Sequence, residues 1–575
     1  MGDATTSSTH EALLERVAKL EAALEAERRA HRTEQAELEA ARNEAISERD
    51  RLRDAYRHLQ LEVELMRRRI VVAKAERIDT AQLELEFAAK LARLDTMGGL
   101  LVPAPAESTD DADEPKGKNK HRPRGRRDLR TLPIPEERIE ITDPALEGST
   151  SRLGTEESCK LMWRRGGLVR VIVARVKYRV GATADDAAPA IATAEMPREL
   201  VARSLATPSL LAHVISDKLC DGLPLHRQED RFARIGVTLD RGTMSRWLQE
   251  VGLTVGATVV QAMHDDAFTH AFCLSTDATG VLVQPTRERE SDKTRRACRR
   301  GHFFVQIADR DHVFFEYTPK ETSAVVGEMF RGFSGYIQAD AKSVYDLLFR
   351  PPDQGGLDDD STRHEVGCWA HARRKLWEAA ITKDVVAREG LARIARIFAL
   401  NRSFRGKPAA EIKALRELHM RPHTDDFFAW VEVEYAKVRD QRGLLRTALG
   451  YAHRQREPLT RFYDDGRLKL DNNASERELR RVAVGRKAWL FVGSDDHAQA
   501  AGNLLTLIAT ARLHGLDPEL YLRDLIRVLP HWPRERYLEL CPRDWIATRD
   551  RLDPVELDLE LGGLTVPPAE QSTTR

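Results

Sequence analysis

The sequence has few features of secreted, membrane-spanning or disulfide-rich proteins. No C-x-x-C pair occurs among its six cysteines, so neither a disulfide framework nor a four-thiolate zinc site is indicated. The first residues are acidic where a secretory signal is basic and then apolar. The longest uncharged apolar run, at about 251–263, is too short to cross a bilayer. We therefore expect a cytoplasmic protein in a reducing compartment, without a membrane partner.

An excess of charge of either sign is also missing, because 91 Lys and Arg residues balance 91 Asp and Glu residues over 575 positions. This length predicts three or four domains at about 100–200 residues each. The balance would argue against a nucleic-acid partner only if the charges were evenly spread. They are not, since residues 107–114 are acidic, residues 115–130 are strongly basic and residues 550–575 are acidic again. Local basic segments therefore keep DNA as an expected partner.

Glycine and proline are almost absent from residues 10–95, which are rich in Ala, Glu, Arg and Leu. Leu13, Val17, Leu20 and Leu24 follow alternating spacings of four and three, and a similar seam returns further along. Such spacing keeps one apolar stripe against a partner helix. We interpret residues 1–95 as a coiled coil that makes the protein a homo-oligomer. A single helix that folds back on the rest of the chain is the alternative.

Residues 96–130 are predicted to be a linker, because prolines at its start are followed by an acidic run and then a basic one. A basic arm broken by Gly and Pro suits contact with DNA phosphates, and solubilising disorder is the other interpretation. The residues expected to contact DNA here are Lys116, Lys118, Lys120, Arg122, Arg124, Arg126 and Arg127.

Residues 131–190 are predicted to form a small β-rich module, because residues 168–180 are dense in β-branched side chains. Residues 191–262 are predicted to be helical. Together with the chain on either side, they indicate a multidomain α+β protein.

A helix-turn-helix outline lies within the helical region. It consists of a helix over Leu225–Arg234, a break at Gly236 and a second helix capped by Asp240. Such outlines also arise by chance in helical domains. If this one binds DNA, the side chains expected on its exposed face are Arg241, Thr243 and Arg246.

Residues 268–371 carry the most informative pattern. A strand-like run contains Asp277, two aromatic-rich runs form a predicted hairpin, a helix follows at about 321–330, and a short strand leads to Asp340. This order, three strands, a helix and a fourth strand, is the order found in an RNase H-like α/β core. In that fold the first and fourth strands are neighbours, so we expect Asp277 and Asp340 to converge.

Two carboxylates held together repel each other unless a cation lies between them. Their hard oxygen atoms favour Mg²⁺ or Mn²⁺, and a third acid would complete a site for two ions acting on a phosphodiester. Glu476, at the predicted start of a basic helix, is the candidate. In a chain with 91 acids, an acid at a strand end is more often a cap or a surface group. The rival acids are Asp309, Asp346, Asp471 and Glu478.

Several longer runs resemble one family. They are CWAHARRKLWEA from Cys368, LDNNASERELRRVAVGRKAWLFVGS from Leu470 and TLIATARLHGLDPELYLRDLI from Thr506. IQADAKSVYD and DGLPLHRQEDRFARIGVTLDRGTMSRWL match further blocks of the same family. Over most of residues 60–535 the chain therefore resembles transposases of the insertion-sequence-66 family, of the TnpC type.

The resemblance implies a DDE transposase in which Asp277, Asp340 and Glu476 bind two Mg²⁺ or Mn²⁺ ions. It also implies a helical insertion over 372–466 and a second part of the RNase H-like core over 467–545. The composition of residues 546–575 indicates an acidic tail. The basic residues expected to position DNA phosphates beside the acids are Arg373, Arg374, Lys375, Arg480, Arg481, Arg486 and Lys487.

The chain departs from the family at a small zinc-binding module, where the expected cysteine positions hold other residues. We therefore expect the β-rich module to keep its shape without zinc. His364, Cys368 and His371 have spacings that could bind zinc with a fourth ligand. We favour instead a fifth core strand over this run, with Cys368 buried and His371 near the DNA or the metal.

We predict a transposase that cleaves the ends of its own mobile element and joins the 3′-hydroxyls to target DNA. The expected partners are double-stranded DNA, a second copy of the chain and small accessory proteins, in the nucleoid-associated cytoplasm. The alternatives are a catalytically inactive DNA-binding regulator and a Mg²⁺-dependent nuclease that does not join strands.

Overall fold

The computed structural model describes residues 134–148, 152–164, 166–180, 190–284, 297–382 and 384–569, with Leu129, Leu132 and single positions nearer the N-terminus. The coiled coil predicted for 1–95 falls outside the described residues apart from those single positions, and the basic residues predicted at 116–127 fall entirely outside them. The chain divides into two compact units. The larger, Arg122–Lys437 with Ala448–Arg575, contains the cleft and the cavity described below.

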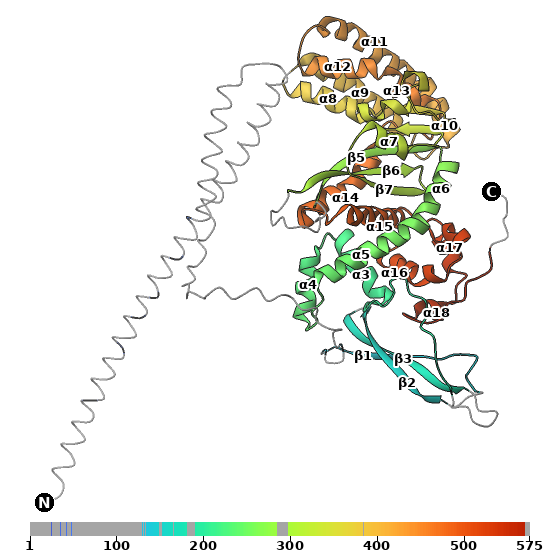
Figure 1. Ribbon diagram of the computed structural model, residues 1–575. Helices are drawn as coiled ribbons and strands as arrows, with labels where there is room; N and C mark the ends of the chain where they lie inside the picture. Colours follow the sequence, from blue (N-terminus) through green and yellow to red (C-terminus); the bar gives the residue numbers. More distant parts are fainter. Residues whose placement is uncertain are drawn as a thin grey trace, which may run out of the picture. The chain divides into compact units, whose positions relative to one another are not determined.

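A first β-sheet is built from the beginning of the described chain (Figure 1). Its strands are β1 (Glu136–Ile141), β2 (Arg152–Arg164), β3 (Gly167–Val180) and β4 (Ala190–Thr193). β3 pairs parallel with β1 and antiparallel with β2 and β4. Apolar residues of β3, among them Val171, Val173 and Tyr178, are buried with Ile141 and Leu561. These side chains form one apolar cluster, to which residues of alternating β3 positions contribute.

Helices follow this sheet. They are α3 (Pro208–Leu219), α4 (Leu225–Arg234), α5 (Arg241–Val255) and α6 (Gln261–His270), with the π-helical turn η1 (Gly256–Val260) between α5 and α6. The helix predicted at 225–234 is present with those bounds. Asp240 caps the next helix by accepting hydrogen bonds from the amides of Gly242 and Thr243. Gly236, between the two helices, has a φ of 81°, a conformation that favours glycine.

A second, five-stranded sheet forms the centre of the unit. Its strands are β5 (Cys273–Val283), β6 (Arg299–Ala308), β7 (His312–Thr318), β8 (Gly335–Gln338) and β9 (Arg363–Val366), in the spatial order β7-β6-β5-β8-β9. The predicted hairpin joins β6 to β7. β5, β6 and β7 are antiparallel neighbours, whereas β8 pairs parallel with both β5 and β9. The first and fourth strands are therefore neighbours, with Cys273 opposite Tyr336 and Ser275 opposite Gln338.

Apolar clusters cover both faces of this sheet. The helices involved include α7 (Ser323–Met329), α14 (Asn473–Trp489) and α15 (Asp495–Leu513). Phe303 and Phe304 are consecutive on β6 and belong to different clusters, because successive strand residues point to opposite faces. α14 and α15 contribute Leu479 and Leu505 to the cluster of Phe303. α7 contributes Val326 to the cluster of Phe304.

A helical segment lies between β9 and α14 in the chain (Figure 1). Its elements are α8 (Trp369–Ile381), α9 (Val385–Ser403), α10 (Ala409–Leu415), η4 (Arg416–Met420), α11 (Arg421–Val438), α12 (Leu444–Arg454), α13 (Arg456–Thr460) and η5 (Arg461–Tyr463). Trp369 packs against Phe427 and Phe428 in its interior. The buried guanidinium of Arg416 donates to the backbone carbonyls of Phe462 and Leu468, which fixes the chain just before α14.

The predicted strand HEVGCWAH is shorter than expected. β9 ends at Val366, Cys368 is the N-cap of α8, and His371 lies in the first turn of that helix. The strand ends because the Gly367 amide donates to the carbonyl of Pro458 instead of continuing the β8–β9 ladder. The prediction that Cys368 is buried is confirmed.

The C-terminal part of the described chain packs back onto the unit. Its elements are α16 (Pro518–Val528), η6 (Leu529–His531), η7 (Arg534–Leu540), α17 (Trp545–Arg549) and α18 (Pro554–Asp558). Leu557 and Leu561, in the segment predicted as an acidic tail, are buried. Glu560 accepts a hydrogen bond of 3.1 Å from the Ser209 amide at the start of α3. Among the described helices, none has the length and apolar composition needed to span a bilayer.

Candidate active site

The three acids predicted from the sequence line one open cleft of about 430 Å³. Asp277 lies on β5, Asp340 lies two residues beyond the end of β8, and Glu476 lies in the first turn of α14. The parallel pairing of β5 with β8 brings the two aspartates close together, just beyond the paired residues Ser275 and Gln338. The packing of α14 against β5 adds the glutamate.

Asp277 and Asp340 both face the ammonium group of Lys342. Lys342 Nζ lies 3.8 Å from Asp277 Oδ1 and 3.5 Å from Asp340 Oδ2. A further carboxylate oxygen, Glu321 Oε1, lies 3.6 Å from the same nitrogen. One positive charge is therefore shared by three carboxylates.

Burial changes the pKa values of the two aspartates and of Lys342. Burial raises the pKa values of Asp277 and Asp340, because a desolvated carboxylate disfavours its charged form. Burial also lowers the pKa of Lys342, but the surrounding carboxylates outweigh this effect and leave that pKa above its usual value. The ammonium therefore stays protonated at neutral pH.

The oxygen atoms of the group fit a divalent cation. Asp340 Oδ1 and Glu321 Oε1 are buried without a hydrogen-bond partner, and such atoms carry a desolvation cost until something binds them. Carboxylate oxygens are the ligands that Mg²⁺ and Mn²⁺ prefer. In donor chemistry Asp277, Asp340 and the neighbouring Glu321 therefore suit a metal of this class, and in this structure their oxygen atoms surround Lys342 Nζ.

Glu476 has different partners in the same cleft. Its carboxylate accepts hydrogen bonds of 3.1 and 3.4 Å from the Arg374 guanidinium, and Oε1 lies 3.9 Å from His371 Nε2. Burial lowers the pKa of His371, which keeps the imidazole neutral at neutral pH. Within the described residues, no three His, Cys, Asp or Glu side chains are gathered closely enough to enclose a metal ion. Lys342 and Arg374 instead neutralise the acids.

The position of α14 is fixed on both sides. Arg486 donates a hydrogen bond of 3.1 Å to Thr279 Oγ1 on β5 and a second bond to the carbonyl of Gly280. The Trp369 amide donates a bond of 2.9 Å to the carbonyl of Leu470, just before the helix. These contacts hold the helix that carries Glu476 against the strand that carries Asp277.

The predicted basic residues around the cleft fall into two groups. Arg374 and Arg480 line the cleft, and Lys487 is exposed further along α14. Arg481 pairs instead with Glu478 at 2.9 Å. Among this first set, Arg374 and Arg480 are the cations closest to the acids.

The other basic residues have aromatic or backbone partners. The Arg373 guanidinium lies over the ring of Phe398, and the Lys375 ammonium lies over the ring of Tyr451. Arg486 is bonded to β5, as described above. These contacts give each of the three side chains a structural role.

Away from the cleft, α5 carries the residues predicted for the helix-turn-helix outline. Arg241 and Arg246 are exposed, and Thr243 is partly buried. The Thr243 hydroxyl accepts a hydrogen bond of 2.9 Å from Arg246. Both arginines are therefore available to solvent on the first two turns of α5.

The rival acids serve local structure. Asp309 accepts hydrogen bonds from the amides of Phe272 and Cys273. Asp346 pairs with Arg350, Asp471 accepts from the Asn473 amide, and Glu478 pairs with Arg481. Each carboxylate therefore has a capping or ion-pair partner.

His364, Cys368 and His371, whose spacing could have suited zinc, also have separate partners. The Nδ1 atom of His364 lies 3.4 Å from Arg461, and the Sγ atom of Cys368 accepts a hydrogen bond from the Asn472 amide at 3.3 Å. Only His371 lines the cleft.

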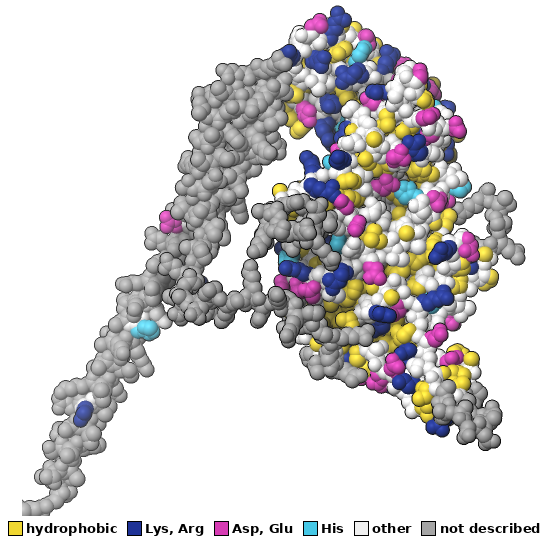
Figure 2. Space-filling view, in the orientation of Figure 1, with side chains coloured by type: hydrophobic (Ala, Val, Ile, Leu, Met, Phe, Trp, Pro, Cys, Tyr) yellow, Lys and Arg dark blue, Asp and Glu magenta, His cyan; other side chains and the backbone are white. Residues whose placement is uncertain are grey.

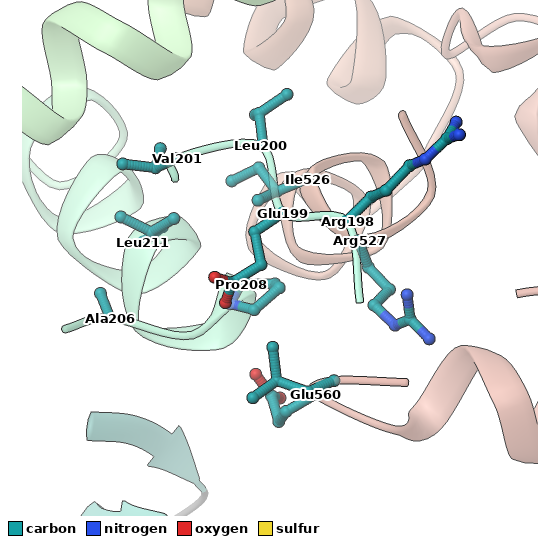
Figure 3. Close-up of a pocket in the computed structure, with 11 residues that line it drawn as sticks. Arg198, Glu199, Leu200, Val201, Ala206, Pro208, Leu211, Ile526, Arg527 and Glu560 are labelled. Carbon is teal, nitrogen blue, oxygen red and sulfur yellow. The ribbon is translucent and has the colours of Figure 1, made fainter. Parts of the chain in front are cut away.

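A second cavity lies between the segment before α3 and the end of α16 (Figure 3). Leu211 and Ile526 contribute apolar walls. Glu199 forms an ion pair with Lys160, with 2.6 Å between Oε1 and Nζ. Its volume of about 20 Å³ is enough for one water molecule and too small for a substrate. The cleft with the three acids is therefore the stronger candidate for chemistry.

Two residues of the site were missed in the sequence. Glu321 precedes α7 and Lys342 follows Asp340 by two positions. Neither has a spacing pattern that would distinguish it from the other acids and bases of the chain. Only their tertiary proximity to Asp277 and Asp340 identifies them as part of the site.

The comparisons with known proteins point to one family. A model described as "Transposase IS66 family" matches residues 203–500, and one described as "IS66 C-terminal element" matches residues 506–542. Similar proteins include the uncharacterized proteins y4qI, y4hP and y4jD of Sinorhizobium fredii. They are 29%, 28% and 28% identical over 60%, 85% and 62% of this chain. The matches cover 64%, 88% and 69% of those proteins, just under two thirds of the first.

Proposed function

The chain belongs to the IS66 family of transposases, and from that premise we propose that it cuts the ends of its own mobile element and joins the freed 3′-hydroxyls to target DNA. The proposed centre is the cleft lined by Asp277, Asp340 and Glu476. The observation that carries the proposal is the convergence of these three acids from β5, the end of β8 and the first turn of α14.

The sheet topology supports an RNase H-like core around this centre. The order β7-β6-β5-β8-β9 has three antiparallel strands followed by two parallel ones, with an acid on the first strand and another at the end of the fourth. The helical segment between β9 and α14 then corresponds to the insertion expected between the second and third acids.

The carboxylates are the residues that would hold the metal. Asp277 and Asp340 would bind Mg²⁺ or Mn²⁺ through oxygens that now face Lys342, and Glu476 would join them once its pair with Arg374 opens. When bound, two such ions activate the attacking oxygen and stabilise the leaving oxygen of a phosphodiester.

Arg374 and Arg480 would position the DNA backbone. Both are exposed side chains that line the cleft, and guanidinium groups bind phosphate oxygens in a bidentate manner. Arg374 would pass from Glu476 to a phosphate as DNA enters.

Further DNA contacts are proposed for the exposed arginines of α5 and for the basic residues 116–127. On the face shown in Figure 2, Lys and Arg side chains are interspersed with Asp and Glu side chains. We therefore infer that binding depends on local clusters of cations, and that affinity falls steeply with added salt. An N-terminal coiled coil would pair protomers so that two element ends meet in one nucleoid-associated assembly, with accessory proteins as further candidate partners.

Purified protein incubated with DNA that carries the element ends and Mg²⁺ tests the proposal. A transposase yields nicked ends and then joined products. A nuclease yields nicks without joining, and an inactive regulator binds the DNA without nicking it. Asp277→Asn, Asp340→Asn and Glu476→Gln are each expected to abolish cleavage. The matched control is Asp311→Asn, which changes an exposed acid on the β6–β7 turn.

A further inference from the structure

Lys342 occupies the position between carboxylates that a divalent cation would need. Its Nζ lies within 3.8 Å of oxygens from Asp277, Asp340 and Glu321. These three acids come from β5, from the segment after β8 and from the segment before α7. An ammonium ion with three carboxylate neighbours is an electrostatic substitute for a metal.

We propose that Lys342 is a built-in cation of the metal site: it holds the carboxylates of Asp277, Asp340 and Glu321 together before metal binds, and a divalent ion must displace it. This inference rests on the proposed function, because it assumes that the aspartates are metal ligands. It adds Glu321 to the site as a further carboxylate and gives Lys342 a positioning role.

The surroundings of the ammonium favour displacement over permanent pairing. The Lys342 side chain is 41% exposed, whereas those of Asp340 and Asp277 are 13% and 17% exposed. The lysine can therefore leave toward solvent while the carboxylates stay in place. Asp340 Oδ1 and Glu321 Oε1 also remain without a hydrogen-bond partner while the ammonium is present. A single ammonium thus leaves part of the oxygen set unsatisfied, which a cation of higher charge and coordination number would satisfy.

Glu321 is held in place from its other side. Its second oxygen, Oε2, lies 3.5 Å from His302 Nε2 on β6. His302 is partly buried. This contact orients the carboxylate so that Oε1 faces Lys342.

The role predicts opposite effects of one substitution on stability and on metal affinity. Lys342→Met removes the charge while keeping much of the side-chain length. Without metal, three carboxylates then repel one another, so the thermal midpoint in EDTA should fall by about 2–4 °C. With metal, no ammonium has to be displaced, so Mn²⁺ should bind about tenfold more tightly than to the unmodified chain.

The experiment is a Mn²⁺ titration of the full chain followed by electron paramagnetic resonance, with thermal unfolding in EDTA as a second readout. Neither requires DNA or enzymatic activity. The matched control is Lys320→Met, which removes an exposed positive charge next to Glu321 in sequence. It should leave Mn²⁺ affinity and the EDTA midpoint unchanged. Glu321→Gln should weaken Mn²⁺ binding.

The possible outcomes distinguish the proposed role of Lys342 from the proposed function of the protein. Tighter Mn²⁺ binding to Lys342→Met, lost on adding Asp277→Asn, supports the role of the lysine. Equal affinity of Lys342→Met and the unmodified chain, with binding still abolished by Asp277→Asn, overturns that role and leaves the proposed function intact. Mn²⁺ binding that does not depend on Asp277 in either background overturns both.

Discussion

The buried side chain of Asn472 donates a hydrogen bond of 2.6 Å from Nδ2 to the carbonyl oxygen of Thr276. Thr276 precedes Asp277 on β5, and Asn472 is the residue from which α14 begins, four positions before Glu476. One hydrogen bond between segments 196 residues apart therefore sets the spacing of two of the proposed metal ligands.

Asn472→Ala should impair chemistry more than folding. The substitution leaves a buried carbonyl without its partner, at a cost of about 1–3 kcal/mol, and lets α14 shift relative to β5. Small displacements of this kind lower rates by roughly tenfold to a hundredfold. Single-turnover cleavage of element-end DNA measures the loss, and Asn473→Ala, on the exposed neighbour, is the control. Equal rates for both variants would contradict this role.

Arg480→Gln should weaken DNA binding and make it less sensitive to salt. If Arg480 contacts one phosphate, the slope of log affinity against log salt concentration should become shallower by about 0.9. Fluorescence anisotropy with labelled element-end duplex at several salt concentrations measures this slope. Arg477→Gln, on an exposed residue of the same helix that does not line the cleft, should keep the original slope. An unchanged slope for Arg480→Gln would place the DNA elsewhere.

The sequence predicted the strands and the acids better than their surroundings. Asp277 and Asp340 could be found because the first lies within a strand-like run and the second follows one, and the order of those runs implies which strands are neighbours. Lys342 and Glu321 could not be found, because their roles depend on tertiary proximity alone. His371 was expected on a strand and lies on α8, since period-two and helical patterns are hard to distinguish over eight residues.

The C-terminal segment shows a second limit of the sequence. Its composition indicated only an acidic tail, yet the side chains of Leu557 and Leu561 are buried. Leu561 belongs to the core of the first β-sheet, which is far away in sequence. Apolar and acidic residues alternate from Val555 to Leu561, and this period-two pattern was hidden by the acidic composition of the whole segment.

The ion pair between Asp359 and Arg363 should make the free energy of unfolding depend on pH in the acidic range. The hydrogen bond from Arg363 holds the pKa of Asp359 at about 2, below its unfolded value of about 3.9. The pair is therefore fully stabilising above about pH 4, and its contribution disappears as the pH falls toward 2.

Asp359→Asn should lower the thermal midpoint by about 2–4 °C at pH 7. The difference from the unmodified chain should narrow as the pH falls from 4 to 3. Circular-dichroism melts at pH 7, 5, 4 and 3 measure it, with Asp360→Asn on the exposed neighbour as the control. A difference that stays constant over this range would show that the pair does not account for the effect.

Gly502 allows α15 to approach β7 closely. A Cβ atom at this position would lie 2.5 Å from the carbonyl oxygen of Phe315, so Gly502→Ala should cost roughly 1–3 kcal/mol of unfolding free energy. Gly563→Ala is the matched control, because no atom lies within 4 Å of a Cβ built there. Urea unfolding of both variants measures the cost, and equal stability would mean that the two elements can separate freely.

The central claim is that Asp277, Asp340 and Glu476 bind the catalytic metal ions, and replacement of each by cysteine tests it most directly. A thiolate binds Mg²⁺ poorly and accepts softer divalent ions better. In cleavage of element-end DNA, the account predicts that Asp277→Cys, Asp340→Cys and Glu476→Cys are inactive with Mg²⁺ and recover part of their activity with Mn²⁺. Full cleavage by any of the three with Mg²⁺ would contradict the account.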